Sequence, residues 1–139
     1  MGPGSVPPLR GVDHLHVHVS DRAAAERWYA RVLGLQRVEE LAGWAADGGP
    51  LTLADRSGTV HLALFERAAS ARHATLALAV DGPAFLAWRT HLARELPAPP
   101  ALEDHGLSWS LYFADPDGNP FELTSYAYAE LAPELRGAS

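Results

Sequence analysis

The chain of 139 residues contains no cysteine, and this absence excludes several kinds of site at once. Without thiols it has no disulfide framework, no thiolate zinc site and no cysteine nucleophile. It also lacks any apolar run near the ~20 residues that span a bilayer, and its Gly/Pro-rich start lacks the apolar centre of a signal peptide. The sequence therefore predicts a soluble, cytoplasmic protein with no membrane partner.

Positive charge is in the minority, with 11 Lys and Arg residues against 17 Asp and Glu and a formal net charge of −6. No run of basic residues interrupts this pattern. Binding to a phosphate backbone needs a concentrated positive field, so nucleic acid is not an expected partner. The length and the 47% hydrophobic content suit a single domain with its own core.

The first half of the chain reads as one strand, one helix and three short strands. Residues 12–19 alternate between apolar residues and histidine, which predicts a half-buried strand. Asp21 is a suitable N-cap for a helix over residues 22–33, and Gly34 is a suitable end. The three further strands are expected at residues 35–41, 50–55 and 59–66, separated by Gly-containing turns.

The second half repeats this order. An alternating strand at residues 74–80 precedes a helix at 81–95 with Pro83 in its first turn. Weak strand character near Leu102 is followed by a hairpin, in which SWSLYFA and PFELTSY flank the turn DPDGN. Laying Val19 on Val80 gives a repeat offset of 61 residues.

Two such units predict an α+β domain built from two βαβββ modules. Their small mixed sheets would enclose a central cavity, with the helices outside. The expected division is an irregular arm at 1–10, one domain at 11–128 with modules at about 11–67 and 72–128, and a tail at 129–139.

Alternation also predicts which side chains face this cavity, because residues two apart on a strand share a face. The inward set comprises His14, His16, His18, His61, His73, Thr75, Glu122 and Thr124. At an offset of 61, Thr75 matches His14 and Glu122 matches His61. An offset of 60 fits the turns better but would exchange the two faces, so the apolar pattern favours 61.

Three motifs resemble the vicinal oxygen chelate superfamily: DHLHVHVSD, WYARVLGL and LYFADPDGNPFEL. This superfamily includes glyoxalase I, extradiol dioxygenases, fosfomycin-resistance enzymes and bleomycin-binding proteins. The resemblance spans roughly Gly11 to Tyr128. It implies paired βαβββ modules, which often hold a divalent metal on the inner faces of their strands.

The resemblance implies a ligand set on these strands. His14 and Glu122 match ligand positions, and His61 falls where glyoxalase-like members tend to have glutamate. Thr75 departs from the pattern, since most members have histidine there and a neutral hydroxyl is a poor ligand. Two imidazoles and one carboxylate favour Fe(II), although Mn, Ni, Co and Zn also suit them. His73, two residues from Thr75 on the same face, is an alternative ligand.

A further likeness to extradiol enzymes lies in HGLSWSLYFADPDGN, where His105 and Tyr112 would assist oxygen chemistry beside the metal. The plainer interpretation of every histidine is a hydrogen-bonded or exposed residue. For His16 and His18 that interpretation competes with lining a substrate cavity, and for His14, His61 and Glu122 it competes with metal binding.

Two classes of function remain open. One is a metal-dependent enzyme for a small oxygenated substrate, with extradiol-type dioxygenase chemistry favoured over a glyoxalase-type lyase or isomerase, which needs a base at the metal. The other is a metal-free binding or resistance protein of the bleomycin-binding type. A homodimer is expected, and the modules could pair within one chain or across two.

Overall fold

The computed structural model describes residue 6 and residues 9–68 and 73–137. In chain order its elements are β1 (Leu15–Val19), α1 (Arg22–Leu33), β2 (Gln36–Arg37), the 3₁₀ helix η1 (Glu39–Leu41), α2 (Gly43–Ala46), β3 (Leu51–Ala54), β4 (His61–Glu66), β5 (Leu76–Ala79), α3 (Gly82–Glu95), β6 (Ala101–Asp104), β7 (Trp109–Ala114), β8 (Pro120–Ser125) and α4 (Tyr128–Arg136). The predicted arm at 1–10, the first residue of the second module and the end of the tail lie largely outside the described residues.

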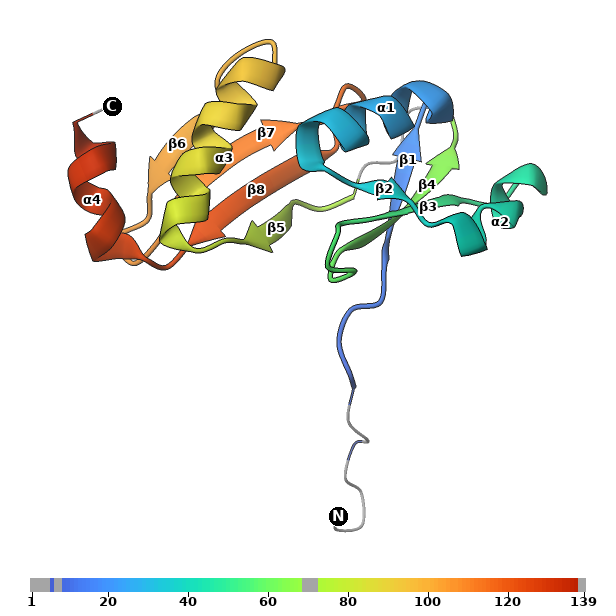
Figure 1. Cartoon of the computed structure of the whole chain (residues 1–139), viewed down its shortest axis with the longest axis horizontal. Coiled ribbons are helices and arrows are strands. Elements are labelled where there is room, and N and C mark those ends of the chain that lie inside the picture. Colours follow the sequence, from blue (N-terminus) through green and yellow to red (C-terminus); the bar gives the residue numbers. More distant parts are fainter. Residues whose placement is uncertain (1–5, 7–8, 69–72, 138–139) are drawn as a thin grey trace.

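The strands form two four-stranded mixed sheets of the same topology. Sheet A has the order β1-β4-β3-β2 and sheet B the order β5-β8-β7-β6. In each sheet the first strand runs parallel to the last strand of its module, and the other pairs are antiparallel. Figure 1 shows the two sheets beside one another along the length of the molecule. The α+β class with two βαβββ units is confirmed.

The helix α1 forms where its local signals predict it. The Asp21 side chain accepts a hydrogen bond from the Ala24 backbone N–H at 3.0 Å, and Gly34 ends the helix in the left-handed region at φ 70°. Both features satisfy backbone groups that a helix end leaves without partners. Trp28 and Val32 bury the inner side of α1, as the four-residue spacing predicts.

The helix α3 covers sheet B in the same way. Its N-cap Asp81 accepts the Ala84 N–H at 2.8 Å, and Pro83 lies in the first turn. Phe85 and Leu92 are fully buried. One continuous hydrophobic core runs through both modules and reaches α4, so the two sheets share a single buried interior.

The turn DPDGN connects the two modules. The buried Asp115 carboxylate accepts the Tyr29 hydroxyl of α1 at 2.6 Å and the Asn119 side-chain amide at 2.8 Å. That same amide donates to the His18 carbonyl of β1 at 3.1 Å. This group of Tyr29, Asp115 and Asn119 is called the module latch below. These contacts give the DPDGN turn a structural role, as expected.

The strand register differs between the two repeats. Leu15 pairs with Leu62, whereas Leu76, which lies 61 positions after Leu15, pairs with Phe121, only 59 positions after Leu62. A single offset of 61 therefore does not hold through both modules. Because the difference is two residues, each side chain of the strand stays on its expected face of the sheet. Glu122 lies opposite Ala77, which is the counterpart of His16 in the second module.

Other differences concern edges and connections. The strand predicted at residues 35–41 pairs only at Gln36–Arg37, after which η1 and α2 follow. The position of His91 between Trp88 and Leu92 on the helix predicts a solvent-exposed side chain. The side chain is instead half-buried, and its Nε2 bonds the Val32 carbonyl at 2.9 Å. The C-terminal segment forms α4. Within the described residues, no helix has the length and apolar character needed to cross a membrane.

Candidate functional site

Each sheet has one face against the helices and an opposite face, called here its open face. On sheet A the apolar residues Val17 and Val19 are completely buried on the helix side, which turns the alternate positions the other way. The open face of sheet A carries His14, His16, His18, His61, Ala63, Phe65 and Thr52. The first-strand histidines therefore lie on the face of sheet A that is opposite the helices.

A pocket of about 220 Å³ lies on this open face. His14 and His61 line it from neighbouring strands, and the indole of Trp44 from α2 adds an apolar wall. The remaining lining residues are Asp13, Leu41, Pro50, Thr52 and Ala63. The structure therefore brings two of the three predicted metal ligands to one depression, together with the tryptophan of the Gly-rich segment.

The histidines of this face also contact one another. His14 Nε2 lies 3.1 Å from His16 Nε2, and the two rings stack at a centroid distance of 5.0 Å. On its other side, His14 Nδ1 lies 2.8 Å from the Asp13 carboxylate. The Phe65 ring packs against His16 at 4.8 Å and against His18 at 6.2 Å. The result is a row of imidazoles along β1.

The open face of sheet B carries a carboxylate and hydroxyls instead. Glu122 accepts the hydroxyl of the fully buried Ser110 at 2.6 Å, and Thr124 Oγ1 lies 3.2 Å from the same oxygen of Ser110. Tyr112 is the direct cross-strand neighbour of Glu122. The floor beside them consists of alanines of β5, so the polar groups of β7 and β8 stand above small side chains.

His105 and Tyr112, the two predicted catalytic residues, are in contact. His105 Nε2 lies 2.9 Å from Tyr112 Oη, with the rings edge to face. Burial, and then the negative charge of Glu122, raise the pKa of Tyr112 above its ordinary value. A phenol with a raised pKa keeps its proton at neutral pH and can donate it in a hydrogen bond.

Thr75 and His73 precede β5. Thr75 is exposed, whereas the His73 ring packs edge-on against the buried Phe121 at 5.2 Å. His73 Nδ1 bonds the Ala74 carbonyl, and its Nε2 is buried without a hydrogen-bond partner among the described residues. The strand β5 begins only at Leu76, so His73 lies before it. Strand alternation therefore does not place His73 on the same face as Thr75.

The predicted ligands occupy two different sheets. His14 and His61 lie on sheet A, and Glu122 lies on sheet B. Among the described residues, no group of three or more His, Cys, Asp or Glu side chains is arranged to hold a metal ion. Both open faces are accessible in the single chain, since His14, His16, Thr75 and Ala77 are all exposed.

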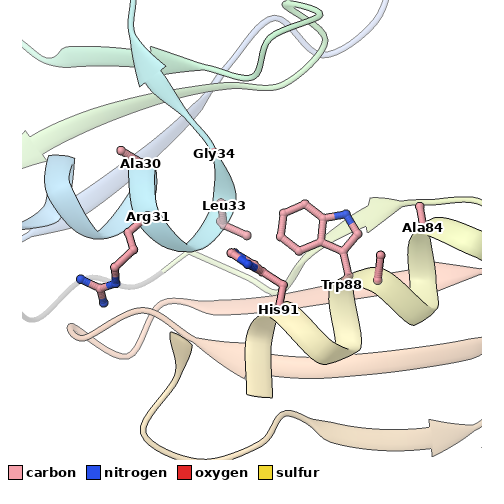
Figure 2. Close-up of a pocket in the computed structure, with 8 residues that line it drawn as sticks. Ala30, Arg31, Leu33, Gly34, Ala84, Trp88 and His91 are labelled. Carbon is pink, nitrogen blue, oxygen red and sulfur yellow. The ribbon is translucent and has the colours of Figure 1, made fainter. Parts of the chain in front are cut away.

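A separate depression of about 440 Å³ lies on the helix side, between α1 and α3. Figure 2 shows Trp88 and His91 of α3 pointing toward Leu33 at the end of α1. The ring nitrogen Nε2 of His91 already bonds a backbone carbonyl. The lining of this depression is mostly apolar, and its one imidazole already has a hydrogen-bond partner. The open faces of the two sheets are therefore the better candidate site.

Three contributors to these faces are not among the residues predicted from the sequence. Asp13 adjoins the first motif, but its hydrogen bond to His14 depends on side-chain rotamers. Phe65 follows the alternation of His61 and Ala63 and could have been assigned by it. Ser110 lies two residues before Tyr112 on β7 and therefore shares its face of the sheet. The hydrogen bond from Ser110 to Glu122 follows from the pairing of β7 with β8.

The family of the chain follows from comparison with known proteins. The family model described as Glyoxalase/Bleomycin resistance protein/Dioxygenase superfamily matches residues 11–123. The chain belongs to this superfamily, whose members are often enzymes and often use a divalent metal. No curated protein sequence gives a significant match.

Solved structures agree on the fold. A glyoxylase/bleomycin resistance protein/dioxygenase domain from Frankia sp. EAN1pec has a TM-score of 0.67 at 17% identity, covering 91% of this chain and 99% of that one. A glyoxalase/dioxygenase from Nostoc punctiforme has a TM-score of 0.63 at 24% identity, covering 91% and 95%. The fosfomycin resistance protein FosX from Listeria monocytogenes has a TM-score of 0.64 at 15% identity, covering 88% and 98%.

Proposed function

We propose that the protein is a divalent-metal-dependent enzyme for a small oxygenated molecule that can chelate the metal. Within that class we favour ring cleavage of the extradiol dioxygenase type, with Fe(II) as the metal. His14, His61 and Glu122 are the proposed ligands, and Tyr112 and His105 the proposed catalytic pair. The observation that carries the proposal is the contact of His105 with Tyr112 beside Glu122.

The donor set fits a divalent metal chemically, because imidazole nitrogens and a carboxylate suit Fe(II), Mn, Ni, Co and Zn. The single chain keeps these donors on separate sheets. We therefore propose a homodimer, in which the open face of sheet B from one copy covers the open face of sheet A from the other. The exposure of both faces and the missing third donor within the described chain support this arrangement.

A divalent metal bound there would supply Lewis acidity or redox chemistry at the substrate oxygens. The side chains around it supply proton handling. The Tyr112 hydroxyl donates a hydrogen bond to a substrate oxygen, and His105 Nε2 exchanges a proton with Tyr112 Oη over 2.9 Å. His16, His18, His73, Thr75 and Thr124 are proposed cavity residues, and Trp44 excludes water from the pocket on sheet A.

The test begins with elemental analysis of the full chain after reconstitution with Fe, Mn, Ni and Zn. We expect one metal per active site, its loss in His61→Ala and Glu122→Ala, and its retention in the helix-side control His91→Gln. Oxygen uptake with a panel of catechols then identifies the dioxygenase. Absence of stoichiometric metal in the unmutated protein would overturn the enzyme proposal.

The dimer has its own readout. Sedimentation velocity is expected to give twice the mass of the 14.9 kDa chain. Mixing the inactive variants His14→Ala and Glu122→Ala should restore part of the activity, because one of the two shared sites in a mixed dimer keeps both residues. A monomer that binds metal with full affinity would contradict this arrangement.

His73 is the alternative third ligand, since its Nε2 is buried without a partner in the described chain. If His73→Ala loses metal while His61→Ala retains it, the ligand set is His14, His73 and Glu122. This result would leave the enzyme proposal standing.

The second candidate function is metal-free binding of a small molecule. Thr75 at a position of a usual ligand favours it, as does the pocket between His14 and Trp44. Calorimetry with cationic and phenolic compounds on metal-free protein tests this function. Tight binding that added metal does not change would support the binding protein over the enzyme.

A further inference from the structure

His14 and His16 bring the same ring nitrogen, Nε2, within hydrogen-bond distance of each other on the open face of sheet A. Their Nε2 atoms are 3.1 Å apart, and both side chains are exposed. Two imidazoles that bind one cation at ~2.0–2.1 Å place their nitrogens about 2.9 Å apart at right angles and about 3.3 Å apart at tetrahedral angles. The observed separation falls between these two values.

The Asp13 carboxylate defines which nitrogen of His14 is free. Asp13 Oδ2 lies 2.8 Å from His14 Nδ1 and can only accept, so the ring carries its proton on Nδ1. Nε2 of His14 is then the bare nitrogen that faces His16. A carboxylate on the far nitrogen is the usual companion of a metal-bound histidine, because it orients the ring and raises its basicity.

The Phe65 ring packs against His16, and the counterpart of His16 in sheet B pairs with a carboxylate. The centroids of the Phe65 and His16 rings are 4.8 Å apart. In the strand register of sheet B, Glu122 lies opposite Ala77, the counterpart of His16, rather than opposite Thr75, the counterpart of His14.

We propose that His16 is a metal ligand together with His14, so that β1 provides a two-imidazole chelate. This inference rests on the proposed metal-dependent function and adds a residue to it. His16 would then supply the nitrogen that Thr75 cannot, and its role would be coordination rather than contact with substrate. His18, further along the same face, remains outside the chelate.

Titration of the full chain with Co²⁺ alone, followed by calorimetry and visible absorption, tests this inference. We expect His14→Ala and His16→Ala each to weaken Co²⁺ binding at least about tenfold. The matched control His18→Ala removes an imidazole from the same strand and face and should stay within about twofold of the unmutated protein. Circular dichroism confirms that each variant is folded.

Nitrogen NMR with Zn²⁺ provides a direct readout of the ligands, since a bound imidazole nitrogen shifts while a free one does not. We expect the Nε2 signals of both His14 and His16 to move. Co²⁺ binding by His16→Ala equal to that of the unmutated chain, with loss only in His14→Ala, would overturn the inference and keep the proposed function. Failure of the unmutated chain to bind any metal would overturn both.

Discussion

The two modules place different chemistry on the same scaffold. On sheet A, β1 and β4 bring His14 beside His61, with His16 in contact with His14. On sheet B, the matching strands carry Ala77 and Glu122. Topology is repeated, but one open face is basic and nitrogen-rich while the other offers a carboxylate and hydroxyls. A repeat of this kind can divide a site into two halves that are complete only when they face each other.

The helix sides differ as well. Val17 and Val19 of β1 are completely buried, whereas Leu76 and Leu78 of β5 are only half-buried. The module latch accounts for part of this difference, because it packs the DPDGN turn of the second module against β1 and α1. Breaking the latch is therefore the strongest way to test how far the two modules depend on each other.

The largest expected effect is that of Asp115→Ala. The Asp115 carboxylate is 5% exposed and accepts the Tyr29 hydroxyl together with the backbone and side-chain amides of Asn119. Its removal leaves buried donors without partners, so the free energy of unfolding should fall by about 3 kcal/mol. Urea denaturation followed by tryptophan fluorescence measures this loss.

The control is Asp117→Ala in the same turn, where the carboxylate is half-buried and accepts a 3.2 Å bond from the Ser20 N–H. We expect it to cost less than about 1 kcal/mol. Equal losses for the two variants would show that the turn, rather than the latch, stabilises the protein.

The next effect concerns alkaline pH. Burial, and then the Asp115 carboxylate, hold the pKa of Tyr29 far above its ordinary value of about 10. Below pH ~10 both the folded and the unfolded chain keep the proton; above it only the unfolded chain releases it. Stability should therefore fall by up to about 1.4 kcal/mol per pH unit above pH ~10 through this residue.

Tyr29→Phe removes that slope and costs about 1–2 kcal/mol at neutral pH through the lost hydrogen bond. The chain has no lysine, so the alkaline titration is dominated by tyrosine. Denaturation at a series of pH values from 9 to 11.5 compares the two proteins, with the exposed Tyr126→Phe as control. Tyr112, whose pKa is also raised, keeps a slope of its own in both proteins; a slope that Tyr29→Phe leaves unchanged would contradict the assignment.

A smaller effect sharpens the contrast between the open faces. Burial and Glu122 raise the pKa of Tyr112, and Glu122→Gln removes the second cause. The pKa of Tyr112 should then move down toward its ordinary value without returning fully to it. Carbon NMR of the labelled tyrosine ring measures the shift, and an unchanged pKa would separate Tyr112 from Glu122 electrostatically.

The smallest effect tests a surface link between the modules. Arg31 of α1 and Glu95 of α3 form an ion pair at 3.1 Å with side chains 54% and 26% exposed. Arg31→Ala should cost no more than about 0.5 kcal/mol, and less in high salt. Arg37→Ala, which breaks the pair with Glu26 inside the first module, is the comparison. A loss above 2 kcal/mol for Arg31→Ala would indicate a role beyond charge.

Much of the fold was predictable because its signals are local. Asp21 and Gly34 define α1 through caps, and alternation defines the faces of β1 and β8. Prediction of a full strand at residues 35–41 was wrong. The last backbone bond to β3 is that of the Val38 N–H to the Thr52 carbonyl, and Glu39 and Glu40 then form the first residues of η1. Periodicity gives no information about where a pairing partner stops.

Part of the candidate site was also predictable from local pattern. Alternation places His14 and His61 on one face, and the pocket on sheet A contains both. The two-residue change of register in the second module could not be foreseen, since a shift of two keeps every apolar residue on its own side. The contacts among Asp13, His14 and His16 depend on rotamers, which no sequence pattern specifies.

The module latch also has a kinetic consequence. It joins residues 86 and 101 positions apart in the chain. Contacts of such separation form late in folding, because the loop between them must close before they contribute. The first module therefore reaches its final stability only after almost the whole chain has been made, and a ribosome-bound fragment ending before Asp115 would hold β1 and α1 without their buried carboxylate partner.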